Sequence, residues 1–481
     1  MNQMKLSGLC PERVFYYFEQ ICAIPHGSGN TKQISDYLVR FAQEHSLRYI
    51  QDQLNNVILF APASAGYGDH PAVILQGHMD MVCAKDEDCS IDFLTDGLDV
   101  DHDGAYVFAR GTTLGGDNGI AVAYALAILE SKDIAHPPLE VVITVDEETG
   151  MFGAAGIDLS MLQGRMLLNM DSEEEGILTV SCAGGCRSTL RLDVQRRAVY
   201  GPCIQLTVDG LAGGHSGVEI HKNRANANKV MGRLLSLVQQ KMPLCLTSLS
   251  GGSADNAIAR SATAKLVAMG MDLEPINDIV AELEQQIRDE YDEPCVHITA
   301  DNVDALGGNA LTTEATAKVI SLLCAAPNGV QSWSPDMPGL VQTSLNLGVM
   351  RLEKQELRLT FSVRSSVNEE KQALLQKLAE VARFHGCQYS QVGDYPAWEY
   401  KPDSKLRDTL VRTYASMFGQ VPQVVSIHAG LECGLLGEKL PGLDSVSIGP
   451  NMQDIHTSRA RLEIASVERT WNFLLEVLKV L

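Results

Sequence analysis

Cysteine is sparse and unpatterned in this sequence. The chain has 12 cysteines among 481 residues, and no two of them form a CxxC pair. Secreted scaffolds built on disulfides and zinc knuckles built on thiolates both need dense, regularly spaced cysteines. Both classes are therefore excluded, and we expect most of these thiols to be reduced residues of an apolar core.

Long apolar runs and basic stretches are also missing. No segment reaches the ~18 consecutive apolar residues of a transmembrane helix, and residues 1–11 lack the features of a signal peptide. Lys and Arg are scattered and the formal net charge is -22, so the chain would repel a phosphate backbone. We expect a cytoplasmic protein with neither a nucleic-acid partner nor a membrane partner.

The length and the changing pattern of the chain predict two domains. A chain of 481 residues exceeds the ~250–300 at which a single core stops growing. Residues 1–186 alternate helical and strand patterns, residues 187–394 have the pattern of a separate α+β unit, and residues 395–481 return to the first pattern. We therefore expect an α/β domain in two parts, 1–186 and 395–481, with the α+β domain inserted between them.

Two apolar runs in the first part do not alternate with polar residues. Val73–Leu75 and Val141–Ile143 predict strands that helices cover on both faces. Gly119–Ser131 is apolar almost all round, which predicts a deeply packed helix. Charged residues stand beside each of these segments, and in open α/β sheets ligands bind outside the carboxyl ends of the strands.

Acids and histidines cluster at these expected strand ends and in one late loop. They are His78, Asp80, Asp117, Glu147, Glu148, Asp171 and the distant His456. Each alone suits an ordinary role, such as a helix N-cap for Asp117 or a solvated pair for Glu147 and Glu148. Together, several carboxylates at one sheet edge would repel each other unless cations neutralised them. Two imidazoles and three carboxylates suit two zinc-like ions, and Asp117 is the natural bridge.

Six motifs in fixed order resemble those of the M20 family of co-catalytic metallopeptidases. They are HMD at 78–80, GTTLGGDNGIA at 111–121, DEETG at 146–150, NMDSEEEG at 169–176, GGHSG at 213–217 and the late His456. Within that family, further stretches resemble the branch of cytosolic non-specific and aminoacyl-histidine dipeptidases. These are CAGG at 182–185, the segment 213–229, AAPNGV at 325–330, HAGLECGLL at 428–436 and SIGP at 447–450. The resemblance spans nearly the whole chain.

The resemblance implies that two zinc ions share these ligands. His78, Asp117 and Asp171 would hold one ion, and Asp117, Glu148 and His456 the other, while manganese and cobalt suit the same set. The implied fold is that of a zinc peptidase, whose catalytic domain has a mixed central sheet flanked by helices.

Two further acids have implied roles in catalysis. Asp80 would bond the second imidazole nitrogen of His78, which fixes its tautomer. Glu147 would be the general base that takes a proton from the metal-activated water and passes it to the departing amine. The resemblance also implies a cis peptide bond between Asp117 and Asn118.

The inserted domain would serve as a lid, as the contact of a homodimer and as the source of specificity. His215 would reach the active site of the partner subunit and bond the oxyanion, and Arg364 would clamp the carboxylate of the dipeptide. The weaker candidates for contacts to the substrate's termini are Asn256, Arg260, His428 and Glu432. Glu432 is equally suited to a structural partnership with His428.

Three functions follow from this reading of the sequence. The first is a metallo-dipeptidase that hydrolyses unspecific dipeptides, Xaa-His among them. The second is a deacylase of N-acyl amino acids, which shares the metal core and differs in its pocket. The third is a catalytically silent dimeric scaffold, against which the intact Asp80 and Glu147 argue. The CAGG, AAPNGV and HAGLECG stretches favour the dipeptidase.

Overall fold

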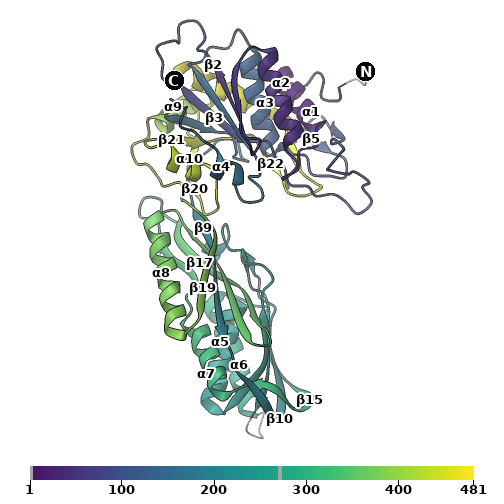
Figure 1. Cartoon of the computed structure of the whole chain (residues 1–481), viewed down its shortest axis with the longest axis vertical. Coiled ribbons are helices and arrows are strands. Elements are labelled where there is room, and N and C mark those ends of the chain that lie inside the picture. The colour runs from purple at the N-terminus through teal and green to yellow at the C-terminus, as the bar shows by residue number, and fades with distance from the viewer. Residues whose placement is uncertain (1–3, 269–273) are drawn as a thin grey trace. The chain divides into compact units, whose positions relative to one another are not determined.

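The computed structural model describes residues 4–268 and 274–481, which form two compact units (Figure 1). The first unit comprises Met1–Ser181, Tyr400–Ser426 and Leu431–Leu481, and the second comprises Cys182–Glu399 and Ile427–Gly430. The second unit thus begins and ends a few residues outside the segment 187–394 that the sequence indicated. The short return at 427–430 had no signal in the sequence.

The main sheet of the first unit is mixed. Its strands follow the order β1-β2-β6-β3-β7-β21-β8-β20. They are β1 (Arg48–Gln51), β2 (Val57–Ala61), β3 (Val73–His78), β6 (Leu139–Thr144), β7 (Met166–Asn169), β8 (Ile177–Cys182), β20 (Gln423–Ile427) and β21 (Asp444–Ser447). Strands β6, β3, β7 and β21 run parallel, whereas β1, β2 and β8 make antiparallel pairs. The expected mixed sheet is confirmed.

Helices flank this sheet (Figure 1). They are α1 (Glu12–Cys22), α2 (Lys32–Glu44), α3 (Gly116–Glu130), α4 (Phe152–Gly156), α9 (Lys405–Phe418), α10 (Cys433–Lys439) and α11 (Ile464–Val480). Strands β3 and β6 are buried at every residue, as their unbroken apolar runs predicted. In α3, the ring of Tyr124 stacks on Trp471 of α11, and its hydroxyl donates to the carbonyl of Val467.

A small antiparallel sheet holds the late loop of the first unit. Its order is β22-β23-β5-β4, with β22 at Met452–Gln453, β23 at Arg461–Glu463, β5 at Tyr106–Ala109 and β4 at Val100–His102. The loop that carries His456 joins β22 to β23. Pairing of β23 with β5 therefore fixes the base of this loop to a segment more than three hundred residues earlier.

The second unit contains the same order of strands and helices twice. One path consists of β10 (Arg196–Asp209), α5 (Ala227–Lys241), β12 (Leu244–Gly251), β14 (Ala262–Ala268), α6 (Glu274–Tyr291) and β15 (His297–Leu311). The other consists of β9 (Gly184–Asp193), α7 (Thr313–Ala325), β17 (Val341–Leu352), β18 (Glu356–Ser365), α8 (Asn368–His385) and β19 (Gln388–Tyr395). Each path is a βαββαβ unit with antiparallel strands, in which the first and fourth strands are neighbours.

The two βαββαβ units are nested and share one sheet. The unit that begins with β10 is inserted between the first strand and the first helix of the unit that begins with β9. Their second strands, β12 and β17, pair antiparallel and join the two halves into a nine-stranded sheet, which β16 (Gly329–Trp333) completes beside β17. A two-stranded sheet of β11 (Gly214–His215) and β13 (Ala257–Ile258) lies off this path.

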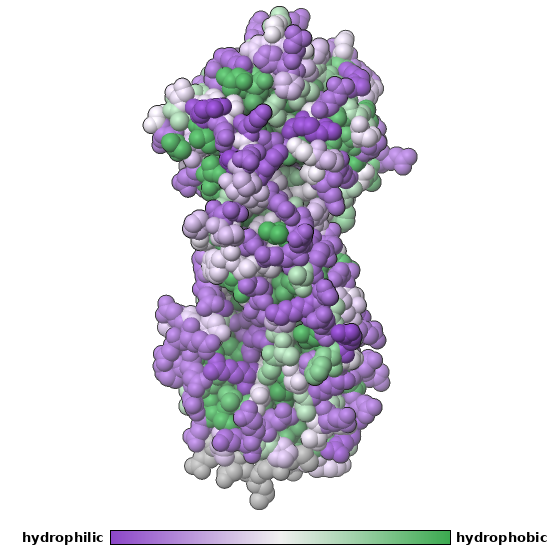
Figure 2. Space-filling model, turned by 90° about the vertical axis from the view of Figure 1, so that its left-hand side faces the viewer, coloured by the Kyte–Doolittle hydropathy of each residue, from purple (hydrophilic) through white to green (hydrophobic). Residues whose placement is uncertain are grey.

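One apolar core underlies this nested arrangement. It contains side chains from all four helices, such as Leu234, Leu283, Leu322 and Leu378, together with strand residues such as Phe361. Hydrophilic side chains cover much of the face drawn in Figure 2. None of the described helices is long and apolar enough to cross a membrane.

Candidate metal centre

Three neighbouring parallel strands of the first unit carry site residues at their ends. His78 is the last residue of β3, the pair Glu147 and Glu148 follows β6, and Asp171 follows β7. Because β6, β3 and β7 are neighbours and parallel, their carboxyl ends meet at one edge of the sheet. Asp117 comes to the same place from the beginning of α3.

Asp117 lies between two imidazoles. One of its carboxylate oxygens is 3.2 Å from Nε2 of His78, and the other is 3.4 Å from Nε2 of His456. The His78 nitrogen is also 3.4 Å from a carboxylate oxygen of Asp171, and the His456 nitrogen is 3.0 Å from one of Glu148. The two groups of three that the resemblance implied therefore meet around one aspartate.

These spacings fit cations placed between the side chains. In a tetrahedral site with zinc–ligand bonds of ~2.0–2.2 Å, neighbouring ligand atoms stand ~3.3–3.6 Å apart. The four separations at this site run from 3.0 to 3.4 Å, close to that range. His78, Asp117 and Glu148 also form a group whose ligand atoms all lie within 4.8 Å of one another, which could hold a metal ion.

Burial is the main influence on the acids at this site. It raises the pKa of Asp171 to about 8 and raises the pKa of Glu147 well above its ordinary value, although His78 opposes both shifts. In the described part of the chain, neither Asp117 nor Asp171 pairs with a Lys or Arg; their ion pairs go to histidines. Asp171 would thus hold a proton at neutral pH unless a cation displaced it.

The imidazoles respond to the same carboxylates. Burial would lower the pKa of His78, but Asp171 and Asp117 outweigh it and raise that pKa well above its ordinary value. Hydrogen bonds to Asp117 and Glu148 raise the pKa of His456 to about 10. Protons on these nitrogens stand where a cation would bind, so the donor set fits divalent metal ions.

Asp80 connects His78 to the loop after β6. The Nδ1 atom of His78 lies 3.0 Å from the carbonyl oxygen of Asp80 and 3.4 Å from its carboxylate, which leaves Nε2 free to face the metal site. The same carboxylate accepts the backbone N–H of Glu147 at 3.1 Å and the hydroxyl of Ser28 at 2.7 Å. Ser28 went unnoticed in the sequence, where only its glycine-rich loop, His26–Asn30, could have drawn attention to it.

Asn118 joins the ends of β3 and β7. Its side-chain oxygen accepts the backbone N–H of His78 at 3.1 Å, and its amide donates to the carbonyl of Met170 at 2.7 Å. The peptide bond between Asp117 and Asn118 is cis, so this expectation is confirmed. The two residues have non-helical backbone angles at the start of α3.

Five of the expected substrate contacts lie in the second unit. His215, Asn256 and Arg260 line a cavity of about 670 Å³. Burial first, and then the charge of Arg364, lowers the pKa of His215 and brings the pKa of His428 to about 3. Both imidazoles are therefore neutral at pH 7, and Nε2 of His428 lies 2.7 Å from the hydroxyl of Ser344.

The tautomer of His215 follows from its hydrogen bonds. Its Nδ1 accepts the backbone N–H groups of Gly217 and Val218, both at 3.2 Å. In a neutral imidazole the other nitrogen, Nε2, then carries the proton. His215 thus offers one N–H donor, the group that an oxyanion needs.

Comparison with known proteins identifies the family. The sequence model of peptidase family M20/M25/M40 matches residues 74–480. The chain belongs to this family. The cytosol non-specific dipeptidase of Escherichia coli (strain K12) is 37% identical over 479 residues, which cover 99% of both chains.

Two solved structures extend this comparison. The aminoacylhistidine dipeptidase from Vibrio alginolyticus matches this M20 peptidase with a TM-score of 0.92 and 36% identity, over 99% of this chain and 98% of that chain. The aminopeptidase PepT from Bacillus cereus matches with a TM-score of 0.57 and 14% identity, over 98% of each chain, which shows a likeness of fold alone. The family resemblance expected from the motifs is confirmed.

Glu432 is the one expected substrate contact that lies in the first unit of this M20 peptidase. Its side chain is fully buried in the first unit, where one carboxylate oxygen accepts hydrogen bonds from Gln76 and from Thr144. The sequence offered Glu432 as a contact to the substrate's amine or as a structural partner of His428, and the bonds in the structure go to Gln76 and Thr144. Because these bonds hold the Glu432 carboxylate below the strand ends, we infer that it supports the site and does not contact the substrate.

A buried polar cluster therefore lies beneath the metal centre. It consists of Glu432 and one polar residue from each of the three ligand-bearing strands: Gln76 of β3, Thr144 of β6 and Asn169 of β7. The amide of Asn169 donates to Gln76, which donates to Glu432. All four side chains are 0% exposed. Since such buried networks hold their members in one arrangement, we infer that this cluster fixes the spacing of the strand ends.

Replacing His456 by Ala should weaken metal binding. Loss of a supporting partner alone costs about 10- to 100-fold in metal affinity, so loss of the proposed ligand should cost at least as much. Competition with a chelator, followed by metal analysis, measures the change. His297→Ala, at an exposed histidine of the second unit, is the matched control and should leave metal binding unchanged. Unchanged affinity in His456→Ala would remove this residue from the ligand set.

Replacing Glu432 by Leu should loosen the strand ends. The change leaves Gln76 and Thr144 without their acceptor, which costs roughly 1–3 kcal/mol of unfolding free energy, and we expect weaker metal binding with it. Glu432→Gln keeps an acceptor oxygen and should restore most of both quantities. Glu438→Leu, at an exposed position of α10, the helix that begins directly after Glu432, is the control. Urea unfolding measures the stability of each variant, and metal titration measures its affinity. If Glu432→Leu matched the control in both quantities, Glu432 would have no supporting role.

Proposed function

We propose that this M20 peptidase is a dipeptidase that hydrolyses unspecific dipeptides, Xaa-His among them, with two zinc ions. The observation that carries the proposal is the position of Asp117 between His78 and His456, with Asp171 and Glu148 beside them. Two relatives that align over nearly the whole chain support the substrate class, since they are a non-specific dipeptidase and an aminoacylhistidine dipeptidase.

The proposed ions divide the ligands as the motifs implied. His78, Asp117 and Asp171 hold one ion, and Asp117, Glu148 and His456 hold the other. Imidazole and carboxylate ligands suit zinc, and manganese and cobalt accept the same set. Divalent cations held by these residues would lower the pKa of a water molecule and would polarise the carbonyl of the scissile peptide bond.

Glu147 moves the proton in this proposal. Its carboxylate makes no hydrogen bond or ion pair within the described residues, whereas its backbone N–H is tied to Asp80. The side chain therefore remains available to take a proton from the attacking water and to deliver it to the leaving amine. Burial raises the pKa of Glu147, which helps its carboxylate to take up a proton from the attacking water.

The second unit recognises the substrate in this proposal. His215 donates its Nε2–H to the oxyanion that forms when water attacks the carbonyl, because its other ring nitrogen is already an acceptor for two backbone N–H groups. Arg364 binds the carboxylate of the dipeptide, and its buried Nε makes no hydrogen bond within the described residues. Asn256, Arg260 and His428 contribute weaker contacts to the substrate's termini.

We further propose that the enzyme is a cytoplasmic homodimer joined through the second unit. Strands β15 and β19 are the two edges of its nine-stranded sheet, and edge strands offer unpaired backbone groups to a second chain. In this arrangement His215 serves the active site of the partner subunit. The relative from Escherichia coli is a cytosol enzyme, which supports the location.

A deacylase of N-acyl amino acids is the alternative with the same metal core. Its substrates lack the free amine of a dipeptide, so the two functions differ in turnover of Ala-His and N-acetyl-alanine. Rapid turnover of Ala-His with little turnover of N-acetyl-alanine supports the dipeptidase, and the reverse order would overturn it.

Glu147→Ala should lower kcat for Ala-His by at least about 10²-fold, because general-base catalysis contributes that much or more. The metal content of the variant should stay at two ions per chain, since Glu147 is not among the proposed ligands. Glu174→Ala, at an exposed acid of the loop after β7, is the control and should keep normal turnover. Near-normal turnover by Glu147→Ala would refute the mechanism.

A mixture of two inactive variants tests the dimer. When Glu147→Ala and His215→Ala chains are coexpressed, a site that takes Glu147 from one chain and His215 from the other is intact. Random pairing makes half of the dimers mixed, each with one intact site, so about a quarter of wild-type activity should return. Activity that stays at the level of the separate variants would show that His215 acts within its own chain or not at all.

A further inference from the structure

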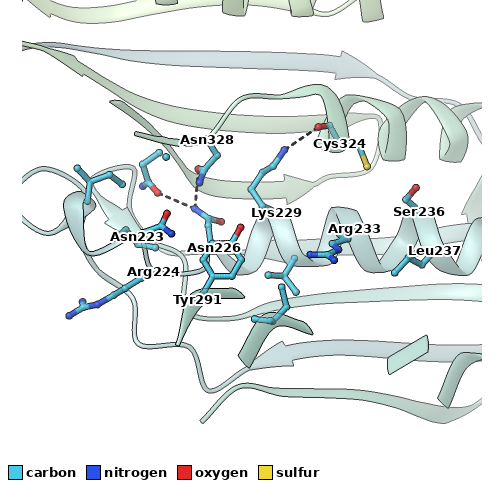
Figure 3. A pocket seen from close by; sticks show the side chains of 16 residues that line it. Asn223, Arg224, Asn226, Lys229, Arg233, Ser236, Leu237, Tyr291, Cys324 and Asn328 are labelled. Carbon is cyan, nitrogen blue, oxygen red and sulfur yellow. Dashed lines mark hydrogen bonds between the residues drawn. The ribbon is translucent and has the colours of Figure 1, made fainter. Parts of the chain in front are cut away.

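A second cavity lies within the inserted domain (Figure 3). It borders the cavity that His215 lines, because Ile258 belongs to both linings. It has a volume of about 430 Å³ and is enclosed by α5, by the C-terminal ends of α6 and α7, and by the loop that contains Asn328. Pockets of ~300–1,000 Å³ are of the size that small molecules occupy in proteins. None of its lining residues has a place in the proposed reaction.

Residues from two of the sequence motifs meet at this cavity, and none of these residues has a role in the proposed hydrolysis. Asn226 and Lys229 belong to the segment 213–229, and Asn328 belongs to AAPNGV, about a hundred residues later. The amide of Asn226 donates to Asn328 at 3.4 Å and to Asn346 at 3.0 Å, which fixes the two motifs to each other (Figure 3). Asn226 is itself buried, so these hydrogen bonds hold the wall of the cavity between the two motifs in a fixed arrangement.

The charge of the lining is opposite to that of the chain. Three basic residues and no acid line the cavity, although the chain has 60 acids and 38 bases. Arg224 and Arg233 are each paired with a glutamate outside the lining, Glu219 and Glu290 respectively. These two arginines are therefore neutralised, and the third cation decides the charge of the cavity.

Lys229 is the cation without a carboxylate partner. In the described part of the chain its ammonium donates only to carbonyl oxygens at the end of α7. They belong to Leu323 and Ala326, both at 2.5 Å, and to Cys324 at 3.4 Å, which is the bond drawn in Figure 3. Burial lowers the pKa of Lys229 to about 8, which still leaves most of it charged at pH 7. The long third bond can yield to a better acceptor, such as an anion.

The remaining lining supplies further donors and an apolar wall. The side-chain amide of Asn328 and that of Asn223 donate no hydrogen bond within the described residues, so both can bind an acceptor. Ile220, Leu237 and Ile287 provide apolar surface in the same cavity. A ligand that matches these walls has one anionic group with two or more acceptor oxygens and an apolar body.

We propose that this cavity binds a small organic carboxylate of amino-acid to dipeptide size, with its carboxylate at Lys229 and Asn328 and its apolar body against Leu237 and Ile287. The site is separate from the metal centre and does not depend on the proposed reaction. The bound carboxylate neutralises the charge of Lys229, as Glu219 and Glu290 neutralise Arg224 and Arg233.

Calorimetric titration of the metal-loaded protein tests the proposal with a matched pair of probes. N-acetyl-L-leucine carries the carboxylate, and N-acetyl-L-leucinamide has the same body without the charge. The first should bind and the second should bind at least about tenfold more weakly, because a hydrogen bond to a charged group contributes ~1.5–3 kcal/mol.

Three variants locate the binding. Ser236→Phe fills the cavity from α5 and should abolish binding while hydrolysis of Ala-His stays normal. Lys229→Met should weaken binding at least tenfold, and Lys241→Met, an exposed lysine at the end of the same helix, should not. Binding that survives Ser236→Phe would place the ligand elsewhere, the metal centre included, and would overturn the proposal. Equal binding of the two probes, or no binding by the wild type, would overturn it as well.

Discussion

Mutual repulsion of carboxylates in a place that water barely reaches is the constraint on which this structure depends. Asp117, Asp171 and Glu148 stand within about 3.4 Å of histidine nitrogens, and no Lys or Arg of the described residues pairs with them. Burial raises the pKa of Asp171, so the group is neutral unless a cation replaces its proton. The fold therefore keeps a site that is complete only with divalent metal ions.

Several tethers hold these acids in place against that repulsion. Parallel pairing of β6, β3 and β7 sets the strand ends side by side, and Asn118 bonds the ends of β3 and β7. Asp80 ties His78 to the loop of Glu147, so the proposed base and a proposed ligand move together. The buried polar cluster around Glu432 supports the same three strands from below. Rigid support of this kind is what metal ligands need, since small displacements change their geometry.

The sequence predicted those parts of the molecule whose signal is local. Unbroken apolar runs gave the buried strands β3 and β6, and the motifs around Asp117 gave the group of proposed ligands. Ser28 was missed because nothing in its loop points to the distant Asp80. Gln76 left a weak trace, as a polar residue that interrupts an apolar strand, but its meaning depends on Glu432, which lies some three hundred and fifty residues later. The doubled βαββαβ path was hidden because one copy interrupts the other, which destroys any tandem period.

Anomalous diffraction at the zinc edge, from crystals of the metal-loaded enzyme, would locate the ions of the proposed centre. We expect two peaks per chain with Asp117 between them: one against His78 and Asp171, the other against Glu148 and His456. A single peak, or a second peak away from Asp117, would contradict a shared centre at the ends of the three strands.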